Sequence, residues 1–272
     1  FDWREKEMLK RRLEKFTLSN PDVKNMKILV AGQIGAGKSS FINSVLSVFQ
    51  GEIVNEAIAE DLGSAASHSS TKKVTYRIRS KDADLPFELC DIKGLEPEKI
   101  SECQIEDIFS HISDIFGHVK KGYKFKEKSP TSDGEHYNQN PSLSDQVFCL
   151  VYIIDASTIQ FAADDKIITE KLRKIRQTIN DKGIPQVIVM SKVDEASYLV
   201  KNDLKMVYRS HIIKERMELC SAKMGVPVSH IFPVKNYHNE INTNDNVDVL
   251  ILKAFDQIVR SADLCQLDRL TQ

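Results

Sequence analysis

The chain has 272 residues, of which 41% are hydrophobic and 28% charged, and its 38 basic and 39 acidic residues give a net charge of −1. This length and composition are ordinary for one globular domain with a sizeable core. The even charge gives no reason to expect a nucleic-acid partner, and no apolar run is long enough to form a membrane segment. Five cysteines without Cys-x-x-Cys spacing predict reduced thiols in a cytoplasmic protein.

An N-terminal helix is the first predicted element, over residues 1–20, because apolar residues recur there at helical spacing. The main domain is expected over residues 21–265 and a C-terminal tail over 266–272. The chain begins at Phe1 rather than at a methionine, so we expect a fragment of a longer protein.

Strands and helices are predicted to alternate through the main domain. Continuous apolar runs, typical of buried parallel strands, lie at 27–31, 147–155, 186–191 and 230–234. Two alternating segments with a short polar link, 74–78 and 87–91, predict a hairpin. Helical patterns lie at 41–49, 101–116, 164–182, 197–224 and 247–258. This order predicts a three-layer α/β domain, with a mostly parallel sheet, one antiparallel edge strand and a ligand at the carboxyl ends of the strands.

The most informative motif follows the first strand, where an apolar run turns into Gly-x-x-x-x-Gly-Lys-Ser and a helical pattern begins at once. This order indicates the phosphate-binding loop of a P-loop NTPase, in which backbone N–H groups and a helix N-terminus converge on an anion. Lys38 is expected to reach the β- and γ-phosphates, and the Ser39 hydroxyl to bind Mg²⁺. The expected nucleotide-binding residues of this loop are Gly32, Gln33, Ile34, Gly35, Ala36, Gly37, Lys38, Ser39 and Ser40.

Two later positions predict how Mg²⁺ and the γ-phosphate are held. Asp91 and Gly94 close a strand with the Asp-x-x-Gly spacing of guanine-nucleotide switches, in which the carboxylate supports the metal and the glycine N–H contacts phosphate. Thr71 stands where a switch threonine would bind both, although Ser69 or Ser70 could substitute. The expected metal ligands are Ser39, Thr71 and Asp91.

The base is predicted to bind after a later buried strand, where the chain reads Ser-Lys-Val-Asp instead of the usual Asn/Thr-Lys-x-Asp. Asp194 would accept hydrogen bonds from the guanine N1–H and 2-amino group, which adenine cannot reciprocate, and Lys192 would pack along the base. Ser191 departs from the usual pattern because its hydroxyl reaches less far than an amide. The last base-contacting loop is expected to contribute Lys235 and Asn236.

No residue is assigned to catalysis. Leu95 stands where a glutamine orients the attacking water in Ras-like enzymes, so turnover is expected to be slow or to borrow a group from a partner or a second copy. His68 reads as a loop histidine rather than a catalyst. Two alternatives stay open. One is an ATPase that uses Asp155 at its Mg²⁺ site, and the other is a pseudo-GTPase interaction module, with which Leu95 and Ser191 are compatible.

Three segments resemble the GTPase-like region of the interferon-induced protein 44 and 44-like family. They are Gly35–Val45, Ser47–Gly51 and Phe232–Tyr237, and the Trp3-Arg4 opening is also similar. The resemblance spans nearly the whole chain. It implies a vertebrate cytoplasmic protein of the interferon and antiviral response, with a TLDc domain upstream.

The sequence thus predicts a Mg²⁺-dependent protein that binds GTP and GDP and acts as a slow GTPase or a nucleotide-regulated switch. A nucleotide-dependent homodimer or a protein partner is the expected kind of assembly.

Overall fold

In the part of the chain that the computed structural model describes, seven strands form one sheet. They are β1 (Met26–Gly32), β2 (Thr71–Arg79), β3 (Asp84–Ile92), β4 (Lys124–Phe125), β5 (Val147–Asp155), β6 (Gln186–Ser191) and β7 (Ile231–Pro233). The described residues are 2–33, 35–57, 71–81, 83–92, 124–125, 140, 142–158, 166–181 and 183–270. The strand order is β4-β2-β3-β1-β5-β6-β7.

Parallel pairing dominates this sheet. β1 lies between β3 and β5, and β6 and β7 follow β5 with parallel pairing throughout. β2 runs antiparallel to β3, which confirms the predicted hairpin, and the two-residue β4 lies beyond β2 at the edge. The predicted fold class, a three-layer α/β domain of the P-loop NTPase type with an N-terminal helix, is therefore confirmed.

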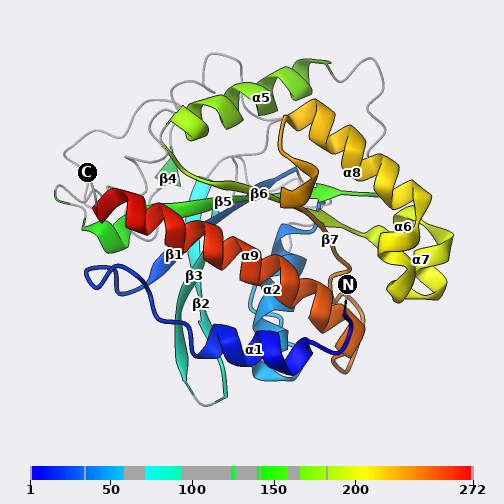
Figure 1. Ribbon diagram of the computed structural model, residues 1–272, viewed down its shortest axis with the longest axis horizontal. Coiled ribbons are helices and arrows are strands. Elements are labelled where there is room, and N and C mark those ends of the chain that lie inside the picture. The colour runs from blue at the N-terminus through cyan, green and yellow to red at the C-terminus, as the bar shows by residue number, and fades with distance from the viewer. Residues whose placement is uncertain are drawn as a thin grey trace.

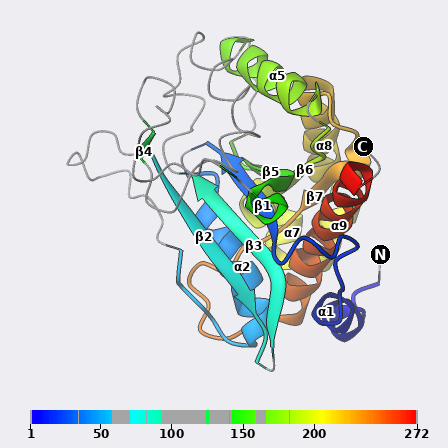
Figure 2. The same ribbon diagram turned by 90° about the vertical axis from the view of Figure 1, so that its left-hand side faces the viewer.

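Helices cover both faces of the sheet (Figure 1). α5 (Lys166–Asp181) and α8 (His211–Met224) lie over one face, whereas α2 (Lys38–Gln50) and α9 (Asp245–Leu270) lie over the other. α1 (Lys6–Glu14) packs on the outside of α9. The turned view in Figure 2 shows the β2–β3 hairpin running along α2. None of the described helices combines the length and apolar character that a bilayer crossing demands.

Apolar side chains fill the space between the layers. Every residue of β5 except Ile154 is buried, as expected for a strand covered on both faces. The ring of Phe255 in α9 packs edge to face against Phe49 of α2, with centroids 5.9 Å apart, and against Phe87 of β3, with centroids 5.6 Å apart. These contacts hold α2, the helix that follows the phosphate loop, against α9 and the sheet.

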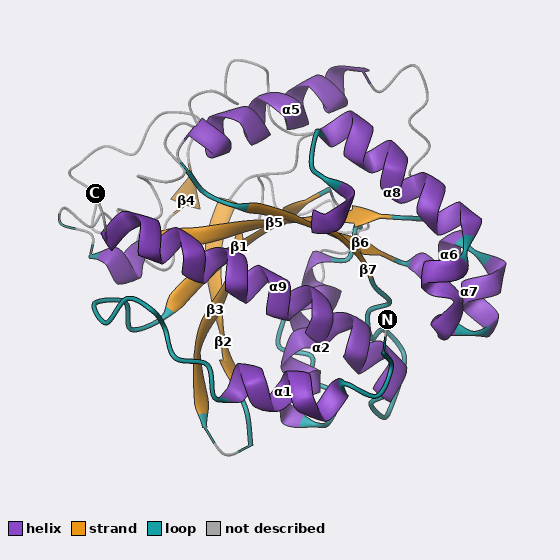
Figure 3. Cartoon of the chain, viewed as in Figure 1, coloured by secondary structure: helices purple, strands orange, loops and turns teal. Residues whose placement is uncertain are grey.

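The segment 197–224, predicted as mostly helical, is divided into shorter helices (Figure 3). The pieces at this corner of the fold are α6 (Val193–Ala196), α7 (Tyr198–Asn202), a 3₁₀ helix over Leu204–Arg209, and α8. Asp203 and Ser210 make the breaks because each side chain accepts a hydrogen bond from a backbone N–H at the start of the next helix.

α9 is longer than the predicted stripe over 247–258. Buried residues recur past that range, at Ala262 and Cys265, so the helix continues to Leu270. Residues 266–270, placed in the predicted tail, are part of it. The helix predicted over 101–116 lies outside the described residues.

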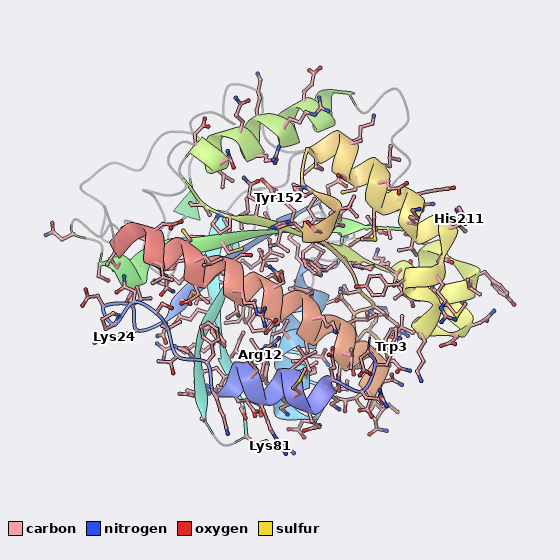
Figure 4. The ribbon with its side chains drawn as sticks, in the orientation of Figure 1. Trp3, Arg12, Lys24, Lys81, Tyr152 and His211 are labelled. Carbon is pink, nitrogen blue, oxygen red and sulfur yellow. The ribbon has the colours of Figure 1, made fainter. Side chains whose placement is uncertain are left out.

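Ion pairs join α1 to α9. Arg12, which points toward α9 in Figure 4, lies 2.5 Å from Asp256, measured from Nη2 to Oδ2. Lys6 Nζ lies 2.7 Å from Asp245 and 2.8 Å from Asp248. Burial alone would lower the pKa of Lys6, but these two carboxylates raise it above the ordinary value. The charge on the buried Asp248 is therefore compensated by the N-terminal helix.

Candidate functional site

The phosphate loop begins where β1 ends, at the carboxyl edge of the sheet. Gly32 pairs with Ile153 of β5, and a Cβ at position 32 would lie 2.4 Å from the Ile153 carbonyl oxygen, so only glycine fits. Gly37 has a φ of +94° and immediately precedes α2, which begins at Lys38. The loop therefore leads directly into a helix N-terminus, whose first N–H groups lack partners within the helix and can bind an anion.

Lys38 turns back over this loop. Its Nζ donates hydrogen bonds to the carbonyl oxygens of Gly32 at 2.8 Å and Gln33 at 3.0 Å. Ser39 and Ser40 lie half-buried in the first turn of α2. The Lys38 ammonium is thus held beside the loop, where it can exchange two carbonyl oxygens for phosphate oxygens.

The predicted metal ligands are only partly described. Ser39 lies in the first turn of α2, and Asp91 lies near the end of β3, paired in register with Val30 of β1. Asp91 is buried, and its charge adds to the effect of burial in raising the pKa of Tyr76. Thr71 is the first residue of β2, and the structure describes its backbone but not its side chain.

A hydroxyl and a carboxylate at one edge of the sheet suit Mg²⁺, which prefers oxygen ligands and takes several of them from nucleotide phosphates. Within the described ranges, no group of three His, Cys, Asp or Glu side chains could hold a metal by itself. Ser39 and Asp91 supply the kind of oxygen ligand that Mg²⁺ takes together with nucleotide phosphates. Six other residues named for the phosphate and switch segments lie outside the described residues: Ile34, His68, Ser69, Ser70, Gly94 and Leu95.

The predicted base-binding residues are Lys192, Asp194, Lys235 and Asn236. Together with Ser191, they form what we call the base side of the site. The loop Gly32–Ser40 with Asp91 is called the phosphate side. The base side follows β6 and β7, next to the phosphate loop along the same edge of the sheet.

An ion pair between two strand ends holds Lys192. Its φ of +55° is the only positive value among non-glycine residues of the described chain. Its Nζ lies 2.7 Å from Asp155 Oδ2, while Asp155 Oδ1 accepts hydrogen bonds from Ser157 N at 2.7 Å and Ser157 Oγ at 2.6 Å. Burial would raise the pKa of Asp155, but these bonds outweigh it and lower the pKa. Both carboxylate oxygens of Asp155 are therefore bonded to the protein in this structure, one to Lys192 and the other to Ser157.

Ser191 and Asn236 both bond to the phosphate loop. Ser191 is fully buried, and its Oγ donates a hydrogen bond to the Ala36 carbonyl oxygen at 2.6 Å. The Nδ2 of Asn236 donates to the carbonyl oxygen of Gly37 at 3.3 Å. The structure therefore brings the ends of β6 and β7 onto the loop that the sequence assigned to the phosphates.

The Asp194 carboxylate lies in the first turn of α6 and is partly accessible. Lys235 Nζ is 3.8 Å from Asp194 Oδ2 but 3.0 Å from Glu240 Oε1, so Glu240 is its nearer partner. Burial would raise the pKa of Glu240, but the backbone N–H of His238 and the Lys235 ammonium lower it to about 2. Lys235 is thus held mainly by Glu240, and Asp194 keeps the capacity to accept hydrogen bonds from a base.

Sequence reasoning missed three contributors to this arrangement. Ser157 stands two residues after Asp155, a spacing typical of side-chain-capped turns that could have indicated it. Glu240 gave no local signal. Tyr237 joins the loop after β7 to both neighbouring helices, since its N–H donates to Ser44 Oγ at 2.9 Å and its hydroxyl donates to Asp248 Oδ1 at 2.6 Å.

No known family profile matches the sequence. The chain is 35% identical over 244 residues to interferon-induced protein 44 of Homo sapiens and 32% identical over 248 residues to that of Mus musculus. It is 30% identical over 247 residues to interferon-induced protein 44-like of Homo sapiens. Each alignment covers 89% of this chain but 53%, 56% and 52% of the respective relative, so the chain spans about half the length of the curated relatives it matches.

Two solved structures show a more distant likeness. Toc33 from Arabidopsis thaliana in complex with Mg²⁺ and GMPPNP is 14% identical, with a TM-score of 0.49 and coverage of 96% of this chain and 92% of that one. A probable GTP-binding protein, engB, is also 14% identical, with a TM-score of 0.41 and coverage of 86% and 98%. The fold assignment rests on the strand order rather than on these scores. The sequence relatives confirm the resemblance carried by the motifs: over 89% of its length, this chain is similar to the interferon-induced protein 44 and 44-like proteins.

Proposed function

We propose that this domain binds guanine nucleotides together with Mg²⁺ and acts as a slow GTPase or a nucleotide-regulated switch. The observation that carries the proposal is the direct link between the two sides of the site, the 2.6 Å hydrogen bond from Ser191 Oγ to the Ala36 carbonyl oxygen. A loop suited to phosphates and a segment suited to guanine are thereby joined into one site.

The phosphate side supplies the charge. Lys38 exchanges its bonds to the loop carbonyls for bonds to the β- and γ-phosphates, and the N-terminus of α2 directs N–H groups to the same oxygens. Ser39 and Asp91 would hold Mg²⁺, which neutralises phosphate charge when bound.

The base side makes the site selective for guanine over adenine nucleotides. Asp194 accepts the guanine N1–H and 2-amino group, and the Lys192 stem, steadied at its end by Asp155, packs along the base. An adenine base would leave the Asp194 carboxylate without these donors, and such mismatches in hydrogen-bonding sites cost on the order of 10⁴ in selectivity.

Calorimetric titration with GTP, GDP and ATP, each with Mg²⁺ and with EDTA, tests this proposal. The expected result is binding of GTP and GDP, with GTP binding strengthened by Mg²⁺ and ATP binding much weaker. Equal affinities for ATP and GTP would contradict the assignment of the base side and support the ATPase alternative.

The second part of the proposal is that bound GTP is hydrolysed slowly. Leu95 offers no group that could orient water, so we expect turnover well below the median enzyme rate of about 10 s⁻¹. If a second copy supplies the missing group, specific activity will rise with protein concentration. Binding without any turnover would instead support a pseudo-GTPase interaction module. Because the sequence relatives are named interferon-induced proteins, we propose that the domain serves the interferon and antiviral response.

A further inference from the structure

Two side chains from neighbouring strand ends contact consecutive carbonyl groups of the phosphate loop. Ser191, the last residue of β6, donates to the Ala36 carbonyl oxygen at 2.6 Å, and Asn236, three residues after β7, donates to that of Gly37 at 3.3 Å. A carbonyl oxygen only accepts hydrogen bonds, so the amide must face Gly37 with its Nδ2. Both carbonyls are thereby fixed toward the ends of β6 and β7, on the side of the base.

The two side chains also end in the same small space. A Cβ placed on Gly37 would lie 3.1 Å from Asn236 Nδ2 and 3.6 Å from Ser191 Oγ. Position 191 carries a serine where the guanine-binding pattern has Asn or Thr, and the amide of Asn236 reaches the loop beside the Ser191 hydroxyl. The ends of β6 and β7 therefore approach the loop at the same point.

The backbone that carries Asn236 is fixed independently of the loop. The Val234 N–H donates to the Met190 carbonyl oxygen at 2.8 Å, and the Tyr237 N–H donates to Ser44 Oγ of α2 at 2.9 Å. The Tyr237 hydroxyl is in turn bonded to the buried Asp248 of α9. Asn236 is therefore presented on a rigid support, as a positioning group requires.

A contribution to the stability of the fold does not explain why an amide side chain stands at position 236. Among the described residues, the buried Oδ1 of Asn236 has no hydrogen-bond partner. A buried acceptor without a partner destabilises the folded state, so the single long bond to Gly37 contributes little net stability.

We infer that Asn236 is a positioning residue for the phosphate loop, and that it supplies from β7 the amide that Ser191 lacks on β6. The inference rests on the proposed nucleotide binding and deepens it. Asn236 acts through the Gly37 carbonyl rather than on the base. Its removal therefore lowers the affinity for every nucleotide by the same factor and leaves the preference for GTP over ATP unchanged.

The test measures GTP, GDP and ATP affinities by calorimetry and thermal unfolding in parallel. Asn236→Ala is expected to lower the affinity for all three nucleotides about tenfold, which is the effect of losing one hydrogen bond. Its melting temperature is expected to stay within about 2 °C of that of the wild type. The matched control is Asn239→Ala, which removes an exposed amide three residues further along the same loop and is expected to change neither quantity.

The decisive variant moves the amide from one strand to the other. Ser191→Asn combined with Asn236→Ser is expected to restore GTP affinity to within about threefold of the wild type, whereas Asn236→Ser alone is not. A double variant that folds but binds no better than Asn236→Ser would overturn the inference, and so would a loss of GTP affinity in Asn236→Ala without a matching loss of ATP affinity.

A third variant covers the case in which the double variant does not fold. Asn236→Asp keeps the shape but places a carboxylate against the Gly37 carbonyl, so it should bind nucleotide more weakly than Asn236→Ala. Wild-type affinity in Asn236→Asp would overturn the inference. If the wild-type protein binds no nucleotide, the proposed function fails together with the inference. If it binds GTP and Asn236→Ala binds equally well, the inference alone fails.

Discussion

The base side and the phosphate side of the site are stabilised by different kinds of contact. On the base side, ionic side chains pair with one another, Lys192 with Asp155 and Lys235 with Glu240. On the phosphate side, Lys38 is bonded to backbone carbonyl groups of its own loop. The base side is therefore built by the protein itself, whereas the phosphate side must exchange internal bonds for bonds to a ligand. Changes on the phosphate side should reduce affinity with little effect on stability, whereas changes to the ion pairs of the base side should affect stability as well.

The largest effect is expected for Lys38→Ala. This change removes the one charge that the loop brings to the β- and γ-phosphates, and we expect GTP affinity to fall by about 1,000-fold or more. The two carbonyl oxygens that Lys38 leaves can bond to water, so the melting temperature should hardly change. Calorimetry and thermal unfolding measure the two quantities, and Lys24→Ala, at an exposed lysine, is the control. A large drop in the melting temperature would remove the contrast between the two sides.

A smaller loss of affinity, about 100-fold for GTP, is expected for Asp194→Asn. The amide replaces an acceptor with a donor toward the guanine N1–H and 2-amino group, so xanthosine triphosphate should become the preferred ligand. Competition binding with both nucleotides measures the reversal, and Asp181→Asn at an exposed position is the control. Unchanged preference for GTP would show that the base is recognised by other groups.

For Asp155→Asn we expect a loss of about tenfold in GTP affinity together with lower stability. The Lys192 ammonium loses its charged partner at 2.7 Å and no longer holds its stem in place. Ser157→Ala should have a milder effect, because the Ser157 backbone N–H still donates to Asp155. If Asp155→Asn instead abolished only the Mg²⁺ dependence of binding, Asp155 would be a metal ligand and the ATPase alternative would gain support.

The smallest effect is expected for Glu240→Gln, and it depends on pH. Because the pKa of Glu240 is lowered from 4.5 to about 2 in the folded protein, the charged carboxylate stabilises the fold above pH 4.5, and this contribution is lost as the pH falls toward 2. We expect the variant to be less stable than the wild type by about 1 kcal/mol at pH 7. Denaturant unfolding across this range should show the difference shrinking below pH 4.5. A difference that grew toward low pH would mean that the charge on Glu240 destabilises the fold.

Local sequence pattern predicted every described strand of the sheet except the two-residue β4, but it did not predict the contacts that build the base side. The strands at 147–155 and 186–191 were predicted with their observed bounds, because a strand buried on both faces is a continuous apolar run. The Lys192–Asp155 and Asn236–Gly37 bonds join residues 37 and 199 positions apart, and no local periodicity encodes such pairs. The sequence pattern of a carboxylate at a strand end is the same whether the side chain binds a metal or pairs with a lysine. The sequence alone therefore left the ATPase alternative open for Asp155.

The link between α1 and α9 determines how this domain can be cut out or recombined with other sequences. Lys6 shares the buried Asp248 with the Tyr237 hydroxyl, and the Tyr237 backbone holds the segment that carries Asn236. Removing residues 1–20 would leave the Asp248 carboxylate in the interior without the Lys6 ammonium. Leaving a buried charge without its partner typically costs several kcal/mol of stability. The smallest transplantable module therefore starts at α1 rather than at β1, and a fusion or domain exchange designed with the junction upstream of Lys6 would preserve the nucleotide site.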